Sequence, residues 1–296
     1  MFTPRVWDGG KVRLLGELSR DLQQPESSLS VSPLSVVVPF VCFTHLVPLP
    51  SQLPLLTAKM TMMSVQPQAC EEGCFSLTME RKFYCRGNAF VKRSLRPREY
   101  RTGHRGIHVP RLAKESLKNE AESLRYIRRH TNIPVPTVYC DFEDDEAYYL
   151  ISEYVQGVSM SNLIESQKAV VREELQGHLA TLRTLVSNRM GGPSGIVIPP
   201  YRVLRRTKVN VWCLRPSDHD EFVFCHNDLS QQNIIVDPDS LKIQAILDWE
   251  YAGFYPPAFE WPFYTRLGPS SAIYEERDDS LELLDFLKSR VQHETT

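Results

Sequence analysis

The chain has 296 residues, of which 42% are hydrophobic and 24% are charged, as in an ordinary globular protein. This length is enough for two domains or for one bilobal unit with a sizeable core. The formal net charge of −2 excludes a global field that would draw the protein to nucleic acid or to an anionic membrane. The seven cysteines are scattered, with no Cys/His set at zinc-ligand spacing, which favours reduced thiols and a cytoplasmic location.

Residues 1–68 differ in composition from the rest of the chain. They are rich in Ser, Pro and Leu without a helical or strand period, so we expect an irregular or poorly ordered extension. The most apolar piece, LSVVVPFVCF, is ten residues long and is interrupted by Pro39. A membrane-spanning helix needs about 20 apolar residues, so no stable membrane insertion is expected. A targeting or anchoring role for this segment, or an incorrectly predicted gene start, stays open as an alternative.

Two strand pairs are predicted from about residue 70 onward. The runs KFYC and AFVKRSL flank Gly87-Asn88, residue types that tolerate a positive φ, and predict a first hairpin. The runs TVYC and AYYLISEYV predict a second hairpin around an acidic turn over 143–145. The basic run over 92–114 is expected to form a solvated surface loop, with a surface that attracts a phosphorylated ligand as the alternative.

A helix is predicted over 115–130, ending near Thr131 ahead of the IPVP segment, where each proline disfavours helical backbone in the residue before it. Its apolar face consists of Leu117, Ala121, Leu124 and Ile127. Glu120 lies on this same face by helical spacing. A carboxylate aimed into a core is costly without a partner, so the pattern predicts that Glu120 faces a cation.

A second helical stretch, either one long helix or a helix pair, is predicted over 161–188. Its expected core face consists of Leu175, Leu179, Leu182 and Val186. The glycine cluster MGGPSG that follows is not succeeded by a Lys-Ser or Lys-Thr helix start, which excludes a P-loop. The sequence contains no repeat, heptad run or nucleic-acid-binding motif, so no nucleic-acid partner is expected.

The run FVFCHNDLSQQNIIVDPDSLKIQAILDWE carries the main chemical signal. FVFC is a short apolar strand, HNDLSQQN is polar, and NIIVD with KIQAILDWE forms a further hairpin. This order places Asp228, Asn233 and Asp248 at loop–strand junctions on one side of a small sheet. Phosphoryl transfer needs a carboxylate that orients the attacking hydroxyl, together with oxygen ligands for Mg²⁺. Asp228 is placed for the first role, and Asn233 and Asp248 are placed for the second.

Four motifs in this chain order resemble those of the protein kinases. HNDLSQQN is similar to the catalytic loop H-R-D-L-x-x-x-N, with Asn227 in place of Arg. The triplet at 248–250, Asp-Trp-Glu, stands where D-F-G would be, and Ala-Phe-Val-Lys at 89–92 resembles the strand with the nucleotide-binding lysine. Glu120 resembles the helix glutamate that pairs with this lysine. His-Asn-Asp followed by Asp-Trp resembles the aminoglycoside phosphotransferase and choline kinase-like branch, including fungal phosphotransferase-family proteins, over about 81–263.

The resemblance implies an α+β, bilobal protein-kinase-like fold. The small lobe over 69–153 would hold an antiparallel sheet and one helix. The mainly helical lobe over 154–296 would hold the catalytic loop, the metal site and the acceptor site. The implied activity is Mg²⁺-ATP-dependent transfer of the γ-phosphate to a hydroxyl of a small molecule.

The resemblance also implies a role for each matching residue. Asp228 would be the catalytic base, with Asn233 and Asp248 as Mg²⁺ ligands. The implied nucleotide-binding residues are Lys92, which contacts phosphate, Glu120, and Glu153 and Val155 of the hinge SEYV, whose backbone would meet adenine. His226 would support the catalytic loop structurally.

Two other classes of function stay open. An inactive nucleotide-binding or scaffold protein is the first alternative, because only Gly73 and Gly87 are available for a glycine-rich loop before Lys92. Lys92 with Glu120 would then be a structural ion pair, and the loop acids would be turn residues. A protein kinase is the second alternative. It is disfavoured because Arg is missing before the catalytic Asp and because only 48 residues follow Asp248.

The sequence does not identify the acceptor or the oligomeric state. The aromatic residues near the metal ligand could cage an ammonium group or could instead pack a core. These residues are Trp249, Tyr251, Tyr255 and Trp261. Glu250 and Glu260 in the same run are expected to anchor packing, with a contact from Glu260 to the catalytic loop as the alternative.

Overall fold

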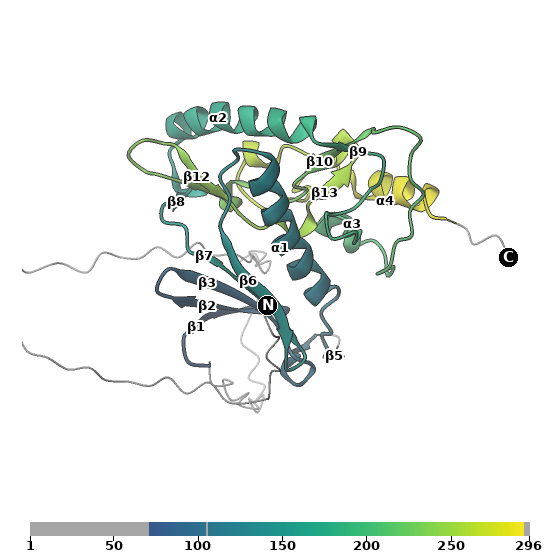
Figure 1. Cartoon of the computed structure of the whole chain (residues 1–296), viewed down its shortest axis with the longest axis horizontal. Helices are drawn as coiled ribbons and strands as arrows, with labels where there is room; N and C mark the ends of the chain where they lie inside the picture. The colour runs from purple at the N-terminus through teal and green to yellow at the C-terminus, as the bar shows by residue number, and fades with distance from the viewer. Residues whose placement is uncertain (1–70, 105, 293–296) are drawn as a thin grey trace, which may run out of the picture. The chain divides into compact units, whose positions relative to one another are not determined.

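The computed structural model describes residues 71–104 and 106–292, so the extension predicted over 1–68 lies outside the described residues. The described chain begins with an antiparallel five-stranded sheet of order β1-β2-β3-β7-β6 (Figure 1). Its strands are β1 (Cys74–Leu77), β2 (Arg81–Arg86), β3 (Ala89–Ser94), β6 (Val138–Asp144) and β7 (Ala147–Glu153), and a separate pair is β4 (Thr102–Gly103) with β5 (Gly106–Ile107). With helix α1 (Ala113–His130), the sheet forms a small lobe that has the antiparallel sheet and the single helix expected from the sequence.

Both predicted hairpins of this sheet are confirmed. β2 and β3 join at Gly87, whose φ of 58° needs a residue that tolerates the left-handed region. The second turn consists of Asp145 and Glu146 rather than residues 143–145, because the pairing of β6 with β7 continues through Asp144. The φ angles of Asp145 and Glu146 are 45° and 62°, as in a type I′ turn, whose twist matches the strands.

Helix α1 contacts both lobes. Leu117 packs with Leu150 of β7, whereas Leu124 and Ile127 belong to the core of the second lobe. The helix ends as predicted, with Thr131 in extended conformation after the last helical residue. The inward face of α1 therefore joins the sheet to the elements that follow it in the chain.

The second lobe has three helices and two three-stranded sheets between residues 154 and 292. The helices are α2 (Glu165–Thr184), α3 (Tyr201–Leu204) and α4 (Ser280–Ser289). The sheets have the orders β13-β10-β9 and β12-β11-β8, with β8 (Val158–Ser159), β9 (Val186–Ser187), β10 (Phe222–Cys225), β11 (Ile234–Val236), β12 (Ile243–Ile246) and β13 (Gly253–Tyr255). The apolar strand FVFC and the hairpin after HNDLSQQN are confirmed as β10 and as β11 with β12.

The stretch predicted over 161–188 contains one long helix, α2, rather than a helix pair. Leu175, Leu179 and Leu182 are buried, as predicted. Val186 was wrongly assigned to the same face, since its side chain is 49% exposed in β9. The physical reason is that Leu185 takes an extended conformation and ends the helix before Val186.

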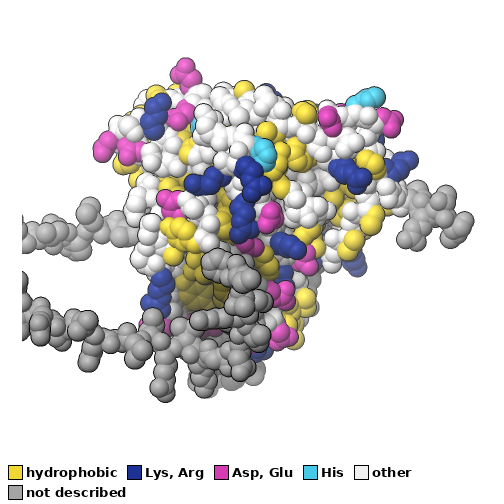
Figure 2. Space-filling view, in the orientation of Figure 1, with side chains coloured by type: hydrophobic (Ala, Val, Ile, Leu, Met, Phe, Trp, Pro, Cys, Tyr) yellow, Lys and Arg dark blue, Asp and Glu magenta, His cyan; other side chains and the backbone are white. Residues whose placement is uncertain are grey.

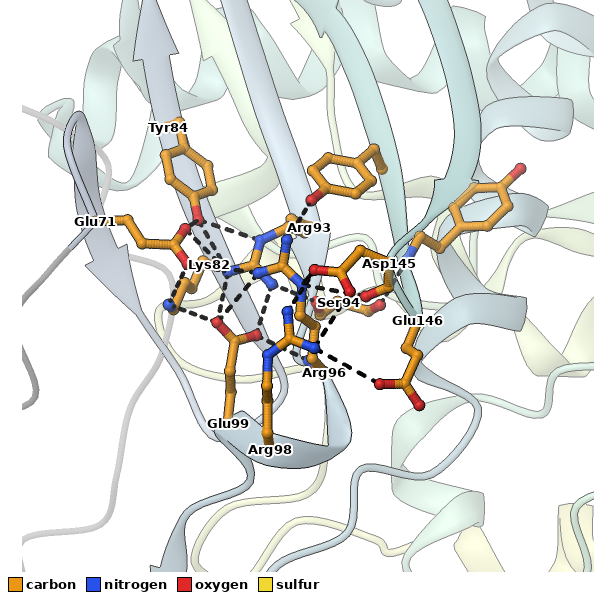
Figure 3. Close-up of polar contacts among 12 residues, drawn as sticks. Glu71, Lys82, Tyr84, Arg93, Ser94, Arg96, Arg98, Glu99, Asp145 and Glu146 are labelled. Carbon is orange, nitrogen blue, oxygen red and sulfur yellow. Dashed lines mark hydrogen bonds and ion pairs between the residues drawn. The ribbon is translucent and has the colours of Figure 1, made fainter. Parts of the chain in front are cut away.

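The basic run over 92–114 is largely exposed between residues 97 and 109, as expected from its charge, but its two ends belong to regular structure. Its first residues complete β3, and Arg93 is only 1% exposed on the sheet face that points away from α1. Figure 3 shows the guanidinium of Arg93 among the carboxylates of Glu71 and Glu99, with Nη1 2.6 Å from Glu99 Oε2. Carboxylates brought by the fold therefore neutralise the buried first part of the run.

Two surface properties bear on possible partners. Within residues 71–104 and 106–292, no helix has the length and apolar character that crossing a membrane requires. Basic and acidic side chains are interspersed over the face drawn in Figure 2. A surface of mixed charge on this face gives no single-sign field for the attraction of a polyanion.

Gly253 in β13 provides a test of the packing beside the catalytic loop. A Cβ at this position would lie 2.6 Å from backbone atoms of Gly191, which cannot move without breaking their own hydrogen bonds to Phe254. We expect Gly253→Ala to lower the free energy of unfolding by about 1–3 kcal/mol in urea denaturation. The matched control is Gly177→Ala in α2, where the Cβ meets open space and helix propensity should add about 1 kcal/mol. Equal stability of the two variants would contradict this account of the packing.

Candidate functional site

Lys92 of β3 lies between two carboxylates from distant parts of the chain. Its Nζ is 2.6 Å from Oε1 of Glu120 on α1 and also contacts Oδ1 of Asp248. All three side chains are largely buried. The predicted cation opposite Glu120 is therefore confirmed as Lys92, and the structure adds Asp248 to the same pair.

The electrostatics of this triad follow from one positive charge shared by two negative ones. Burial alone would lower the pKa of Lys92, but the charges of Asp248 and Glu120 outweigh it and hold the pKa above its ordinary value. Burial raises the pKa of Glu120. Burial also acts to raise the pKa of Asp248, but the charge of Lys92 overcomes it and keeps this pKa below its usual range. Asp248 is thus held ionised beside a fixed ammonium group.

His226 at the start of the catalytic loop is fully buried, and both ring nitrogens have backbone partners. The N–H of Asp228 donates to Nδ1 at 3.2 Å, so Nε2 carries the proton that it donates to the carbonyl of Leu247 at 2.8 Å. The ring packs at 4.5 Å from the Trp249 ring. Burial lowers the pKa of His226 to about 4, which keeps the imidazole neutral. These contacts fit a structural role.

Asp228 and Asn233 lie at the two ends of the polar loop and contact each other. Nδ2 of Asn233 donates to the backbone carbonyl of Asp228 at 2.8 Å and more weakly to its carboxylate at 3.3 Å. Asp228 stays partly exposed, whereas the loop around it is buried. Burial raises the pKa of its carboxyl to about 7. The arrangement presents a partly accessible carboxylate on a fixed backbone.

Glu260 binds the catalytic loop from the other side. Its Oε2 accepts the backbone N–H of Asn227 at 3.2 Å and that of His226. Asn227 has a φ of 69°, and its Nδ2 donates to the carbonyl of Tyr251 at 2.8 Å. The contact from Glu260 to the loop, raised as an alternative from the sequence, is therefore confirmed.

The segment after Asp248 is bound to the small lobe by contacts that the sequence did not reveal. The guanidinium of Arg81 in β2 binds the carboxylate of Glu250, with Nη1 3.0 Å from Oε1. Asn119 of α1 donates to the carbonyls of Glu250 and Ala252 at 3.1 and 2.9 Å. No local pattern could predict pairs so far apart in sequence. The one available signal was Asn119, a polar residue on the buried side of α1 that needs a hydrogen-bond partner.

The predicted hinge residues lie at and just beyond the end of β7. Glu153 turns its carboxylate to Thr137, with Oε2 2.7 Å from Oγ1, so its side chain is engaged away from the hinge backbone. The N–H of Tyr154 donates to Asn88. Val155 makes no backbone hydrogen bond to another described residue, which leaves both of its peptide groups available to a ligand.

An aromatic face next to this hinge was missed from the sequence. Phe83 pairs directly with Lys92 across the strands, and Phe90 precedes Lys92 by two residues, so all three share one face of the sheet. The rings of Phe75, Phe83, Phe90 and Tyr154 form a chain with centroids 6.0–6.5 Å apart. Partly exposed aromatic rings of this kind can stack on a flat heterocycle.

The aromatic cage that the sequence raised for an ammonium group is not formed. Trp249 and Tyr255 are fully buried, and their polar atoms bind the carbonyls of Ile246 and Ile198. Tyr251 is also buried, and of the four predicted residues Trp261 is partly exposed. Trp249, Tyr251 and Tyr255 each belong to a hydrophobic core cluster, so their ring faces do not enclose a ligand.

The donor set near Asp228 suits one kind of metal ion. The described residues contain no group of three or more His, Cys, Asp or Glu side chains that could enclose a metal. Asn233 uses its amide nitrogen on Asp228, which leaves its oxygen for a ligand, and Asp248 adds a carboxylate. Mg²⁺ commonly takes only one or two protein oxygens and completes its shell with water and phosphate, so these residues fit it.

The structure brings together a small sheet with a Lys–Glu pair, a polar loop and an acidic segment after the next hairpin, the set of features that the resemblance to the kinases implied. Residues 199–269 match the model of the Phosphotransferase enzyme family. The chain is 26% identical over 163 residues to ethanolamine kinase 2 of Mus musculus, covering 48% of this chain and 40% of that protein. It is 29% identical over 111 residues to serine/threonine-protein kinase D of Synechocystis sp., an alignment that covers 36% of this chain and 19% of that protein.

The solved structure of an aminoglycoside-3'-phosphotransferase of type VIII is 21% identical, with a TM-score of 0.41, covering 62% of this chain and 73% of that one. The match to the Phosphotransferase enzyme family includes the loop over 226–233 and Asp248, the residues on which the resemblance was based. It matches less than half the length of the curated ethanolamine kinases.

The buried neutral His226 predicts a stability change with pH. An unfolded histidine titrates near 6.5, whereas His226 titrates at about 4 in the fold, so acid favours the unfolded state. The contribution of the neutral ring to the free energy of unfolding is fully present above pH 6.5, and about 3 kcal/mol of it should be lost as the pH falls to 4. Urea unfolding of wild type and His226→Asn between pH 4 and 7.5 measures it, with His219→Asn at an exposed position as control. Parallel profiles for wild type and His226→Asn would contradict the neutral buried ring.

Proposed function

We propose that this protein is a Mg²⁺-ATP-dependent phosphotransferase that acts on a hydroxyl group of a small molecule. The observation that carries the proposal is the contact of Lys92 with both Glu120 and Asp248, next to the loop that holds Asp228 and Asn233. A lysine that touches a helix carboxylate and a potential metal ligand is suited to bind the phosphates of a nucleotide. The family match over the catalytic loop supports the same reaction class.

In this proposal each residue has one task. Lys92 contacts phosphate, Glu120 holds Lys92, and the backbone of Glu153 and Val155 binds the base. The partly exposed carboxylate of Asp228 accepts the proton of the attacking hydroxyl. Asn233 and Asp248 would hold Mg²⁺, which neutralises charge on the phosphates when bound. Residues 69–153 serve as the nucleotide lobe and residues 154–296 as the acceptor lobe of a cytoplasmic enzyme.

The proposed acceptor is a small amino alcohol. Ethanolamine comes first because three of the similar proteins are named ethanolamine kinase 2. An aminoglycoside is second, since solved phosphotransferases of that kind resemble the chain in sequence at a lower level. Because Trp249 and Tyr255 are buried, groups other than these two rings would have to bind the amine of the acceptor.

An inactive nucleotide-binding protein is the second candidate, and one observation favours it. The connection between β1 and β2 is Thr78-Met79-Glu80, without glycine. Thr78 Oγ1 accepts the N–H of Arg81 at 3.0 Å and closes this turn. A glycine-free turn that carries a carboxylate offers phosphates no close approach to backbone N–H groups. Binding without turnover would favour this candidate.

The first prediction concerns nucleotide binding. Calorimetric titration should give a micromolar Kd for ATP in the presence of Mg²⁺. Such a Kd corresponds to a binding free energy of about −8 kcal/mol. Asp248→Ala should lose the Mg²⁺-dependent part of the affinity because one of the two proposed metal ligands is removed. Asp239→Ala, in the exposed turn between β11 and β12, is the matched control. Absence of binding by wild type would reject a working nucleotide site.

The second prediction concerns turnover. Phosphorylation of ethanolamine, choline and an aminoglycoside can be followed by the release of ADP. Asp228→Asn should lower kcat by about 100-fold or more, because the amide cannot accept the hydroxyl proton. Its Kd for Mg²⁺-ATP should stay near the wild-type value. A variant with near-normal kcat would remove Asp228 from the role of base.

A further inference from the structure

Arg202 lies outside the catalytic loop in the sequence, yet its guanidinium ends on it. The residue sits in the short helix α3 and is only 2% exposed. Its Nη1 donates to the backbone carbonyl of Asn227 at 3.3 Å, and its Nη2 donates to that of Phe259 at 2.9 Å. A guanidinium therefore reaches the residue that directly precedes Asp228.

Asp279, just before α4, holds this guanidinium in place. Its two oxygens accept from Nε and Nη2 of Arg202 at 2.9 and 3.0 Å, a bidentate ion pair. Both partners are buried, and the guanidinium also lies 5.2 Å from the ring of Phe263. A bidentate ion pair holds the planar guanidinium in one orientation. The position of Nη1, which does not bind Asp279, is therefore determined as well.

The peptide group between Asn227 and Asp228 is consequently bound at both of its polar atoms. Its carbonyl accepts from Arg202, and its N–H donates to the ring of His226. The preceding N–H groups are bound by Glu260. With this peptide plane fixed, the Cα of Asp228 is fixed too, and the amide of Asn233, 3.3 Å from Oδ2, restricts the carboxylate.

The chain lacks the arginine that the protein-kinase pattern has before the catalytic aspartate, since Asn227 stands there. In kinases regulated by their activation loop, ordering of the active site depends on arginine contacts with an added phosphate. Here the guanidinium comes from Arg202 and its anionic partner is the carboxylate of Asp279. Neither group requires a covalent modification to be in place.

We propose that Arg202 and Asp279 form a positioning pair for Asp228, which keeps the catalytic loop in its working conformation without phosphorylation. The proposal rests on the proposed phosphotransferase function for its kinetic consequence. Its structural consequence, an ordered loop at residues 226–229, can be measured without any turnover. Loss of the donor from Arg202 leaves a buried carbonyl unpaired and lets the peptide group rotate.

The test compares Arg202→Lys and Asp279→Asn with a neighbouring control. Lysine keeps the charge but cannot bind Asp279 and the Asn227 carbonyl together, and Asp279→Asn is a milder change that keeps one acceptor oxygen. The control is Arg206→Lys, because Arg206 forms an exposed ion pair with Asp278 between the same two segments. Hydrogen exchange at residues 226–229, kcat, KM, the Kd for Mg²⁺-ATP and Tm are measured for each protein.

We expect faster exchange at residues 226–229 and a fall in kcat of about 10- to 100-fold in Arg202→Lys, with a smaller fall in Asp279→Asn. The Kd for Mg²⁺-ATP should be unchanged, and Arg206→Lys should match wild type. A lower Tm with unchanged exchange and unchanged kcat in both variants would overturn the proposal, because the pair would then act on stability alone. If wild type has no turnover, the proposed function fails, and the exchange data still decide whether the pair orders the loop.

Discussion

One lysine shared by two carboxylates holds the candidate site together. Lys92 comes from the sheet, Glu120 from α1 and Asp248 from the segment after β12, so a single ammonium group ties both lobes to the potential metal ligand. A buried charge that loses its partner is strongly destabilising. The fold of the small lobe and the placement of Asp248 therefore depend on the same electrostatic contact. The contact of Arg81 with Glu250 fixes the same segment two residues farther on.

The catalytic loop is buried, so its peptide groups cannot rely on water and need partners from the protein. Glu260 supplies acceptors and Arg202 supplies a donor from positions distant in sequence. This solution has a cost, because the second oxygen of Glu260 is buried without a described hydrogen-bond partner. Burial accordingly raises the pKa of Glu260 to about 7. A loop fixed in this way can keep Asn227 in the left-handed region, which asparagine tolerates better than most residues.

The two ends of the small lobe differ in chemistry. At the hinge, Phe83, Phe90 and Tyr154 present aromatic surface on the side of Lys92, which suits a flat base. At the other end, the turn between β1 and β2 contains Glu80 and no glycine. The hinge end therefore offers aromatic surface for stacking, whereas at the other end Lys92 is the cation beside the carboxylates of Glu120 and Asp248.

The sequence by itself determined the features that depend on local spacing. Strand-like runs joined by turn residues predicted both hairpins, and the helical period predicted α1 with Glu120 facing inward. The loop motif brought Asp228, Asn233 and Asp248 into one hypothesis. Only the tertiary structure decided which distant side chains meet. It paired Arg81 with Glu250 and Arg202 with Asp279, it collected the aromatic face, and it buried the tryptophan and tyrosine rings expected near an amine. The physical reason is that such contacts depend on how the packed elements cross, which neither residue type nor spacing records.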